Sequence, residues 1–171
     1  MLEIRPIVVS EWNVWKAFRL FALQESPLAF GSTFAEEILF SDERWKQQLE
    51  TMTIFGAFAE SKLIGCAGFR VHEMLQMKHR GVFFGMYVHP DYRGRKVAHQ
   101  LLDHLIAYAK TQVVQLHCGV KLINSSAIAL YEKCGFVRYA IEPRTIKVGD
   151  IYYDDTWMVI FFDEKKNYER T

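Results

Sequence analysis

A short basic turn is the part of the chain best suited to chemistry. Arg93, Arg95 and Lys96 stand directly before a segment, Val97 to Ala109, whose apolar residues recur at helical spacing. The first N–H groups of a helix have no partner within the helix, and the helix dipole adds partial positive charge there. The side-chain cations would reinforce both effects. The pattern therefore suits a phosphate group, although many turns of this kind are only solvated surface.

Such a turn works only if a strand and a helix hold it in place. Val82–Val88 is an apolar, β-like run that stops at His89-Pro90, and Val97–Lys110 has the periodicity of a helix. Val113–Val120 then alternates apolar and polar residues, as a strand does. We therefore expect a strand, a basic turn, a helix and a second strand in succession.

A second stretch combines polar residues with an apolar helical face. Asn124–Cys134 is predicted to be a short helix, because Asn124 or Ser125 can cap its start. Gly135 stands where a left-handed residue would end it. Tyr131 lies on the apolar face, where periodicity alone indicates an ordinary core aromatic.

The rest of the chain completes a mixed α/β pattern. Helices are predicted after Ser10 and after Ser41, and Leu28–Glu37 is predicted to be a loop. The other predicted strands are Leu2–Arg5, Thr53–Ala59, Leu63–Val71, Tyr139–Lys147 and Ile151–Phe162. No repeat or linker interrupts this order, so one domain is expected over residues 1–171, with a fraying tail from Asp163.

Composition narrows the class of protein. Half of the 171 residues are hydrophobic, and the formal net charge is only +1. So balanced a charge argues against nucleic acid or an anionic membrane as the main partner. No apolar run approaches the ~20 residues that span a bilayer. The N-terminus carries charge where a signal peptide needs an apolar run, so the cytoplasm is the expected location.

The cysteines and histidines give no sign of a metal centre. Cys66, Cys118 and Cys134 are far apart and lie in apolar surroundings, as free thiols in a reducing compartment would. The six histidines lack the H-x-x-x-H spacing, and there is no C-x-x-C. We therefore expect no metal.

The two stretches together resemble the Gcn5-related N-acetyltransferase (GNAT) superfamily. Arg93-Gly94-Arg95-Lys96-Val97-Ala98 is similar to the family's Gln/Arg-x-x-Gly-x-Gly/Ala loop, except that Lys96 replaces the usual glycine. Asn124 to Phe136 is similar to the signature N-x-x-A-x-x-L-Y-x-x-x-G-F. The resemblance covers nearly the whole chain. It implies a mostly antiparallel mixed sheet of about seven strands, splayed between strands 4 and 5, with about four flanking helices.

The resemblance also implies acetyl-coenzyme A as the cosubstrate. Its pyrophosphate would lie on the amides of Arg93–Ala98 and its pantetheine arm along Met86–Val88. The N–H of Val88 would then face the thioester carbonyl. The implied contact residues are Met86, Tyr87, Val88, Arg93, Gly94, Arg95, Lys96, Val97, Ala98, Asn124 and Lys133. From the residues alone, Met86–Val88 could equally be an ordinary buried strand, and Asn124 could be only a helix cap.

The implied reaction moves an acetyl group to a primary amine of a small molecule or peptide, by direct attack in a ternary complex. Tyr131 is the family's candidate to protonate the departing thiolate. No acid precedes Met86 on the strand, so the general base cannot be assigned. Glu36 and Glu37 are candidate acceptor-binding residues, and Asp154 and Asp155 are weaker candidates of the same kind. Together these acids mildly favour a cationic amine.

Two other functions and a homodimer are also compatible with the sequence. The same fold could hold coenzyme A without turnover, which the lysine at position 96 keeps possible. A nucleotide-phosphate enzyme is disfavoured because neither G-x-x-x-x-G-K-[ST] nor G-x-G-x-x-G occurs. A homodimer through the C-terminal strands is possible, although their apolar residues could equally be core.

Overall fold

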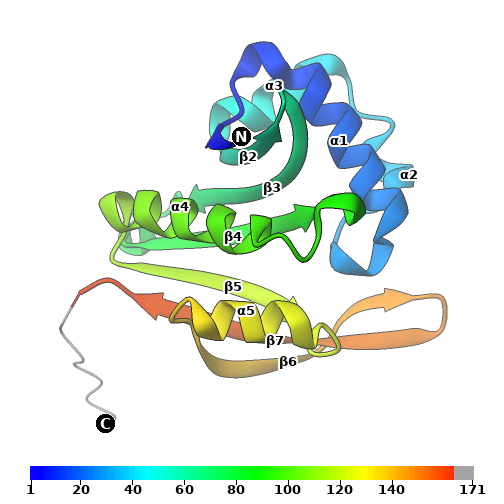
Figure 1. Cartoon of the computed structure of the whole chain (residues 1–171). Helices are drawn as coiled ribbons and strands as arrows, with labels where there is room; N and C mark the ends of the chain where they lie inside the picture. The colour runs from blue at the N-terminus through cyan, green and yellow to red at the C-terminus, as the bar shows by residue number, and fades with distance from the viewer. Residues whose placement is uncertain (164–171) are drawn as a thin grey trace, which may run out of the picture.

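The computed structural model describes residues 1–163 and places seven strands in one mixed sheet. The sheet order is β1-β2-β3-β4-β5-β7-β6 (Figure 1). The strands are β1 (Leu2–Pro6), β2 (Thr53–Ala59), β3 (Lys62–Val71), β4 (Arg80–Val88), β5 (Gln115–Lys121), β6 (Val137–Val148) and β7 (Ile151–Phe161). The helices are α1 (Trp12–Glu25), α2 (Phe34–Glu37), α3 (Asp42–Thr51), α4 (Val97–Gln112) and α5 (Ser125–Lys133).

Helices cover both faces of the sheet. Leu101 and Leu105 of α4 and Ile128 of α5 pack into one buried cluster with β2 to β5. Trp15 of α1 and Trp45 of α3 pack into a second cluster on the opposite face. The apolar residues of each helix recur on one side, so each helix buries that side against the sheet and leaves the other to solvent.

The sheet opens between β4 and β5. These two strands run parallel and pair only from Arg80 with Gln115 to Val82 with His117, while every other neighbouring pair is antiparallel. Beyond Val82 the strands separate, and Figure 1 shows β5 descending away from β4. A register shift between β3 and β4, with Gly85 at φ +64°, bends β4 at the same place. The predicted sheet and its splay are confirmed.

Most predicted elements are present, with shifts at their ends. The segment predicted as a loop contains the single turn α2, which Thr33 and Glu36 cap reciprocally. β6 begins at Val137, two residues before the prediction. Cys66 and Cys118 are buried free thiols, and Cys134 is partly exposed. The predicted fraying tail lies mostly outside the described residues.

None of the helices within residues 1–163 is long and apolar enough to cross a membrane.

Candidate active site

A cavity of about 880 Å³ lies where β4, the basic turn, α4 and α5 meet. It is lined by nearly all of the residues that the sequence assigned to the cofactor. These are Met86, Tyr87, Val88, Arg93, Gly94, Lys96, Val97, Ala98, Asn124 and Lys133. Arg95 is the exception, because its guanidinium lies over the ring of Tyr92 at 5.3 Å and it does not line the cavity. The structure thus brings ten of the eleven assigned residues to one site.

The basic turn presents backbone donors to this cavity. Gly94 and Lys96 both have left-handed backbones, with φ of +74° and +63°. Lys96 is the N-cap of α4, and its side chain makes no capping hydrogen bond. The first amide that bonds back into the helix is that of Gln100, to the carbonyl of Lys96. The amides of Val97, Ala98 and His99 are therefore unmatched within the helix and suit an anion.

The left-handed backbone explains why the lysine at position 96 is unusual. A side chain at positive φ crowds the following carbonyl, which is why glycine normally occupies such positions. The fold imposes this conformation nonetheless, so Lys96 adds a cation beside the helix N-terminus at the expense of some backbone strain.

Arg93 holds the turn to the end of α1. Its guanidinium donates to the carbonyl of Val88 at 3.0 Å and to both oxygens of Glu25, at 2.8 and 3.3 Å. Glu25 also accepts from the Tyr87 hydroxyl at 2.8 Å and from the Ser26 hydroxyl. These bonds, led by those from Arg93, lower the pKa of Glu25 to about 2. Sequence patterns do not predict this contact, because Glu25 and Arg93 are 68 positions apart.

Tyr131 lies between this larger cavity and a second cavity of about 420 Å³, and it lines both. Its ring packs edge-on against Phe83 at 5.1 Å between centroids. Burial raises the pKa of this phenol far above its usual range, with a smaller contribution from Cys118. The hydroxyl therefore keeps its proton at neutral pH, and no described residue hydrogen-bonds to it. It is free to donate to a ligand.

Asn124 caps α5 and also borders both cavities. Its side-chain oxygen accepts from the amide of Ala127 at 3.2 Å and from the Ser126 hydroxyl at 3.1 Å, which caps α5. The residue also lines both cavities.

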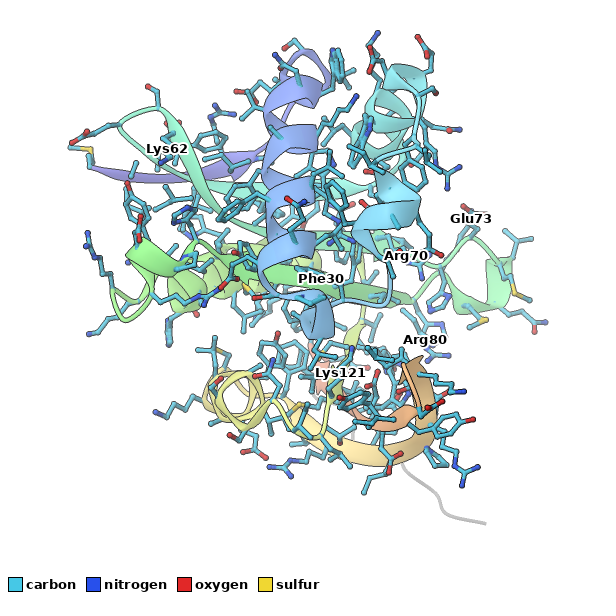
Figure 2. The ribbon with its side chains drawn as sticks, turned by 90° about the vertical axis from the view of Figure 1, so that its right-hand side faces the viewer. Phe30, Lys62, Arg70, Glu73, Arg80 and Lys121 are labelled. Atoms are coloured by element: carbon cyan, nitrogen blue, oxygen red, sulfur yellow. The ribbon has the colours of Figure 1, made fainter. Side chains whose placement is uncertain are left out.

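The second cavity lies on the other side of the opening between β4 and β5. Its walls come from β4, β5, β7 and the loop after α1, and Figure 2 shows Phe30 and Lys121 on opposite sides of this region. Arg19, Lys121 and Asp155 are the charged residues among those that line it. Arg19 and Lys121 carry no sequence motif that would have marked them as site residues.

Three of the four acids that the sequence analysis proposed for the acceptor lie outside this cavity, and only Asp155 lines it. Glu36 is exposed and bonds to Thr33, whereas Glu37 is only 3% exposed and forms an ion pair with Arg19 at 2.7 Å. The carboxylate of Asp154 accepts from the amide of Arg144 at 2.8 Å. None of these three acids lines the second cavity, so direct contact with an acceptor there would require rearrangement.

One group of possible metal ligands comes together in space. His99, Asp103 and Cys134 bring their ligand atoms within 4.8 Å of one another. His99 Nδ1 already lies 2.8 Å from the carboxylate of Asp103, so two of the three groups partner each other.

Comparisons with known proteins show the family of this chain. A sequence model described as the acetyltransferase (GNAT) family matches residues 16–136. The chain therefore belongs to the GNAT family of acetyltransferases, which are acyltransferases.

Two curated relatives match parts of the chain. The [ribosomal protein bS18]-alanine N-acetyltransferase of Salmonella typhimurium is 44% identical over 54 residues, which are 31% of this chain and 36% of that protein. The N-alpha-acetyltransferase RimI of Mycobacterium tuberculosis is 37% identical over 62 residues, which are 36% of this chain and 38% of that protein. The matches thus span well under half of the length of these relatives.

Two solved structures share the fold over almost the whole chain. A GNAT-family acetyltransferase from Streptococcus pneumoniae has a TM-score of 0.84 at 20% identity, covering 95% of this chain and 100% of its own. The Salmonella typhimurium protein yncA, solved with its cofactor acetyl-CoA, has a TM-score of 0.84 at 17% identity, covering 100% and 99%. At such identities the likeness shows the fold.

Proposed function

We propose that this chain is an N-acetyltransferase that moves an acetyl group from acetyl-CoA to a primary amine by direct attack in a ternary complex. The observation that carries the proposal is the position of Tyr131, a protonated phenol on the wall between two cavities. One cavity suits a cosubstrate with a phosphate group, and the other is open to a second reactant.

The residues of the larger cavity fit acetyl-CoA. The unmatched amides at the start of α4 and the cation of Lys96 suit the pyrophosphate. A Cβ built on Gly94 would meet no atom within 4 Å, so the turn leaves space for a ligand. The second half of β4 borders the same cavity without pairing to β5 and suits the pantetheine arm. Acetyl-CoA supplies the activated acyl group.

The chain's own groups then have separate tasks. A backbone amide near Val88 would hydrogen-bond the carbonyl oxygen as negative charge grows on it, and one such donor contributes about 3 kcal/mol. Tyr131 would donate its proton to the thiolate that leaves. A primary amine is mostly protonated at neutral pH, so the incoming amine must first lose a proton. Water in the second cavity is the proposed route for that proton.

Thiol release tests the proposal. Purified protein is incubated with acetyl-CoA and a panel of amino acids, amines, polyamines, aminoglycosides and peptides, and free thiol is followed over time. Release that depends on an amine supports the proposal. Release with none of them contradicts it.

Coenzyme A binding without turnover is the second candidate, and the strained lysine at position 96 is the observation that favours it. Calorimetry with coenzyme A, combined with the thiol-release assay, would separate the two. Binding without any amine-dependent thiol release, and no effect of Tyr131→Phe, would support the non-catalytic module.

A homodimer through the C-terminal strands stays a prediction. β6 is an edge strand, and Val137 and Ile141 on it are exposed. Sedimentation of the purified chain and of Ile141→Lys tests this, because a charge on the edge strand should favour the monomer. A monomer at all concentrations in the unmodified chain would exclude the dimer.

A further inference from the structure

Lys121 carries a cation on a largely buried side chain. It is the last residue of β5, it is 8% exposed, and it lines the second cavity. No hydrogen bond or ion pair joins its ammonium to any residue in the described part of the chain. Burial lowers the pKa of Lys121, so its charged form is less favourable here than in water unless an opposite charge or strong hydrogen bonds compensate it. The cavity is where such compensation can come from.

Asp155 stands beside it with an unmet acceptor. It is the strand partner of Lys121 across β5 and β7, so both side chains project from the same face of the sheet. Its Oδ1 is buried and, among the described residues, has no hydrogen-bond donor. The two charges attract each other, yet no ion pair within 4.0 Å joins them in residues 1–163. The cavity thus offers one cation and one anion, both in need of a partner.

The opposite wall adds a second cation, Arg19, whose hydrogen-bond donors are only partly occupied. Arg19 donates hydrogen bonds to the carboxylate of Glu37, from Nε to Oε2 at 3.0 Å and from Nη2 to Oε1 at 2.7 Å. Its guanidinium lies over the ring of Phe30, 4.5 Å from the ring centroid. Nη1 has no hydrogen bond to the described residues. Glu37 turns away from the cavity to bind Arg19, so it neutralises the guanidinium without presenting its own charge to an acceptor.

We propose that this cavity binds an acceptor that carries a carboxylate next to its primary amine, as a free amino acid does. The carboxylate accepts from Lys121 Nζ, and the acceptor's N–H donates to the carboxylate of Asp155, which lines the cavity. The inference rests on the proposed acetyl transfer and names the acceptor class for it. It replaces the expectation of a purely cationic amine, because three of the acids that favoured one, Glu36, Glu37 and Asp154, do not line the cavity. Lys121 lines it beside the fourth acid, Asp155.

The space is suited to a small acceptor. The cavity holds about 420 Å³, and Gly119 leaves its floor without a side chain beside Trp157. A peptide N-terminus would bring an amide carbonyl, which is neutral, to the place where a free amino acid brings its carboxylate. Lys121 would then stay uncompensated. The inference therefore separates amino acids from peptide N-termini as acceptors.

Matched acceptors test it. Initial rates of thiol release are measured at saturating acetyl-CoA with a panel of amino acids, the carboxamide of each, and neutral dipeptides that begin with the same residue. The expected result is a value of kcat/KM roughly 10- to 100-fold higher for at least one amino acid than for its carboxamide and dipeptide, the range for a hydrogen bond to a charged group. Equal or higher values for the carboxamides or dipeptides would overturn the inference.

Variants assign the preference to Lys121. Lys121→Met should raise KM for the amino acid by a similar factor and leave the carboxamide within about 3-fold, whereas Lys121→Arg should keep the preference. Lys110→Met, which removes an exposed lysine at the end of α4, is the control and should change neither. Equal losses for acid and carboxamide in Lys121→Met would overturn the assignment. Coenzyme A binding confirms that each variant is folded.

The acetyl transfer and the acceptor class can be tested separately. Thiol release with polyamines or peptides but with no amino acid would overturn the acceptor class and leave the acetyl transfer intact. No amine-dependent release at all would overturn both.

Discussion

At the scale of single residues, the site combines a protonated phenol with a strained lysine. Tyr131 belongs to the apolar face of α5, as its spacing indicated, and it also borders two cavities. The two interpretations that the sequence left open, core aromatic and proton donor, are compatible because the ring packs in the core while the hydroxyl is free of described partners.

Tyr131→Phe should lower kcat by about 10- to 1000-fold, the usual effect of losing one proton-transfer group. The ring and its packing remain, so affinity for coenzyme A and the melting temperature should hardly change. Steady-state rates and calorimetry on the same preparation measure this. An unchanged kcat would remove Tyr131 from the mechanism.

The backbone at position 96 gives a separate prediction about stability. Both Lys96→Gly and Lys96→Ala remove the cation, but only glycine tolerates φ of +63° without strain. The glycine variant should therefore be more stable than the alanine variant by about 1 kcal/mol. Urea unfolding of the two variants measures the difference, and equal stability would mean that the left-handed conformation carries no strain.

At the scale of elements, the basic turn is fixed by a helix far away in the sequence. Glu25, in the last turn of α1, receives hydrogen bonds from Arg93, Tyr87 and Ser26, and so links α1, β4 and the turn before α4. Arg93 therefore acts on the cofactor cavity mainly by positioning the turn.

This network should make stability depend on pH. The pKa of Glu25 in the folded chain is about 2, below its ordinary value of 4.5. Its ionised form thus stabilises the fold above about pH 4.5, and this contribution is lost as the pH falls from about 5 toward 2. Glu25→Gln should destabilise the protein at pH 7 and much less near pH 3. Unfolding curves of both proteins across this range test the sign, and a difference independent of pH would contradict it.

The elements also show what the sequence could and could not predict. Helices and strands with a long apolar period appear where the pattern put them, because each buries one side. α2 was missed because it is a single turn, although Thr33 and Glu36 carried a capping signal. The partnerships of Glu25 with Arg93 and of Glu37 with Arg19 join residues distant in sequence, and spacing holds no information about them. Spacing likewise does not predict that Lys121 lines a cavity, because the cavity exists only where β4 and β5 separate.

At the scale of the whole molecule, one buried apolar cluster packs on each face of the sheet. The candidate site lies where β4 and β5 separate. α4 packs on β2, β3 and β4, whereas α5 lies over the far strands (Figure 1). The larger cavity is bordered by residues of both helices, such as Val97 of α4 and Lys133 of α5. A single domain over the full length stays a prediction.

The brief pairing of β4 with β5 has a mechanical consequence. Only three residue pairs, at one end, join these strands, so the far end of each lacks the partner that a sheet normally supplies. A ligand bound in the opening would contact both strands and protect their unpaired amides from exchange with solvent. Saturating coenzyme A should therefore slow deuterium uptake most at Phe84–Val88 and around Val120, and far less in β1. Uniform slowing would place the occupant elsewhere.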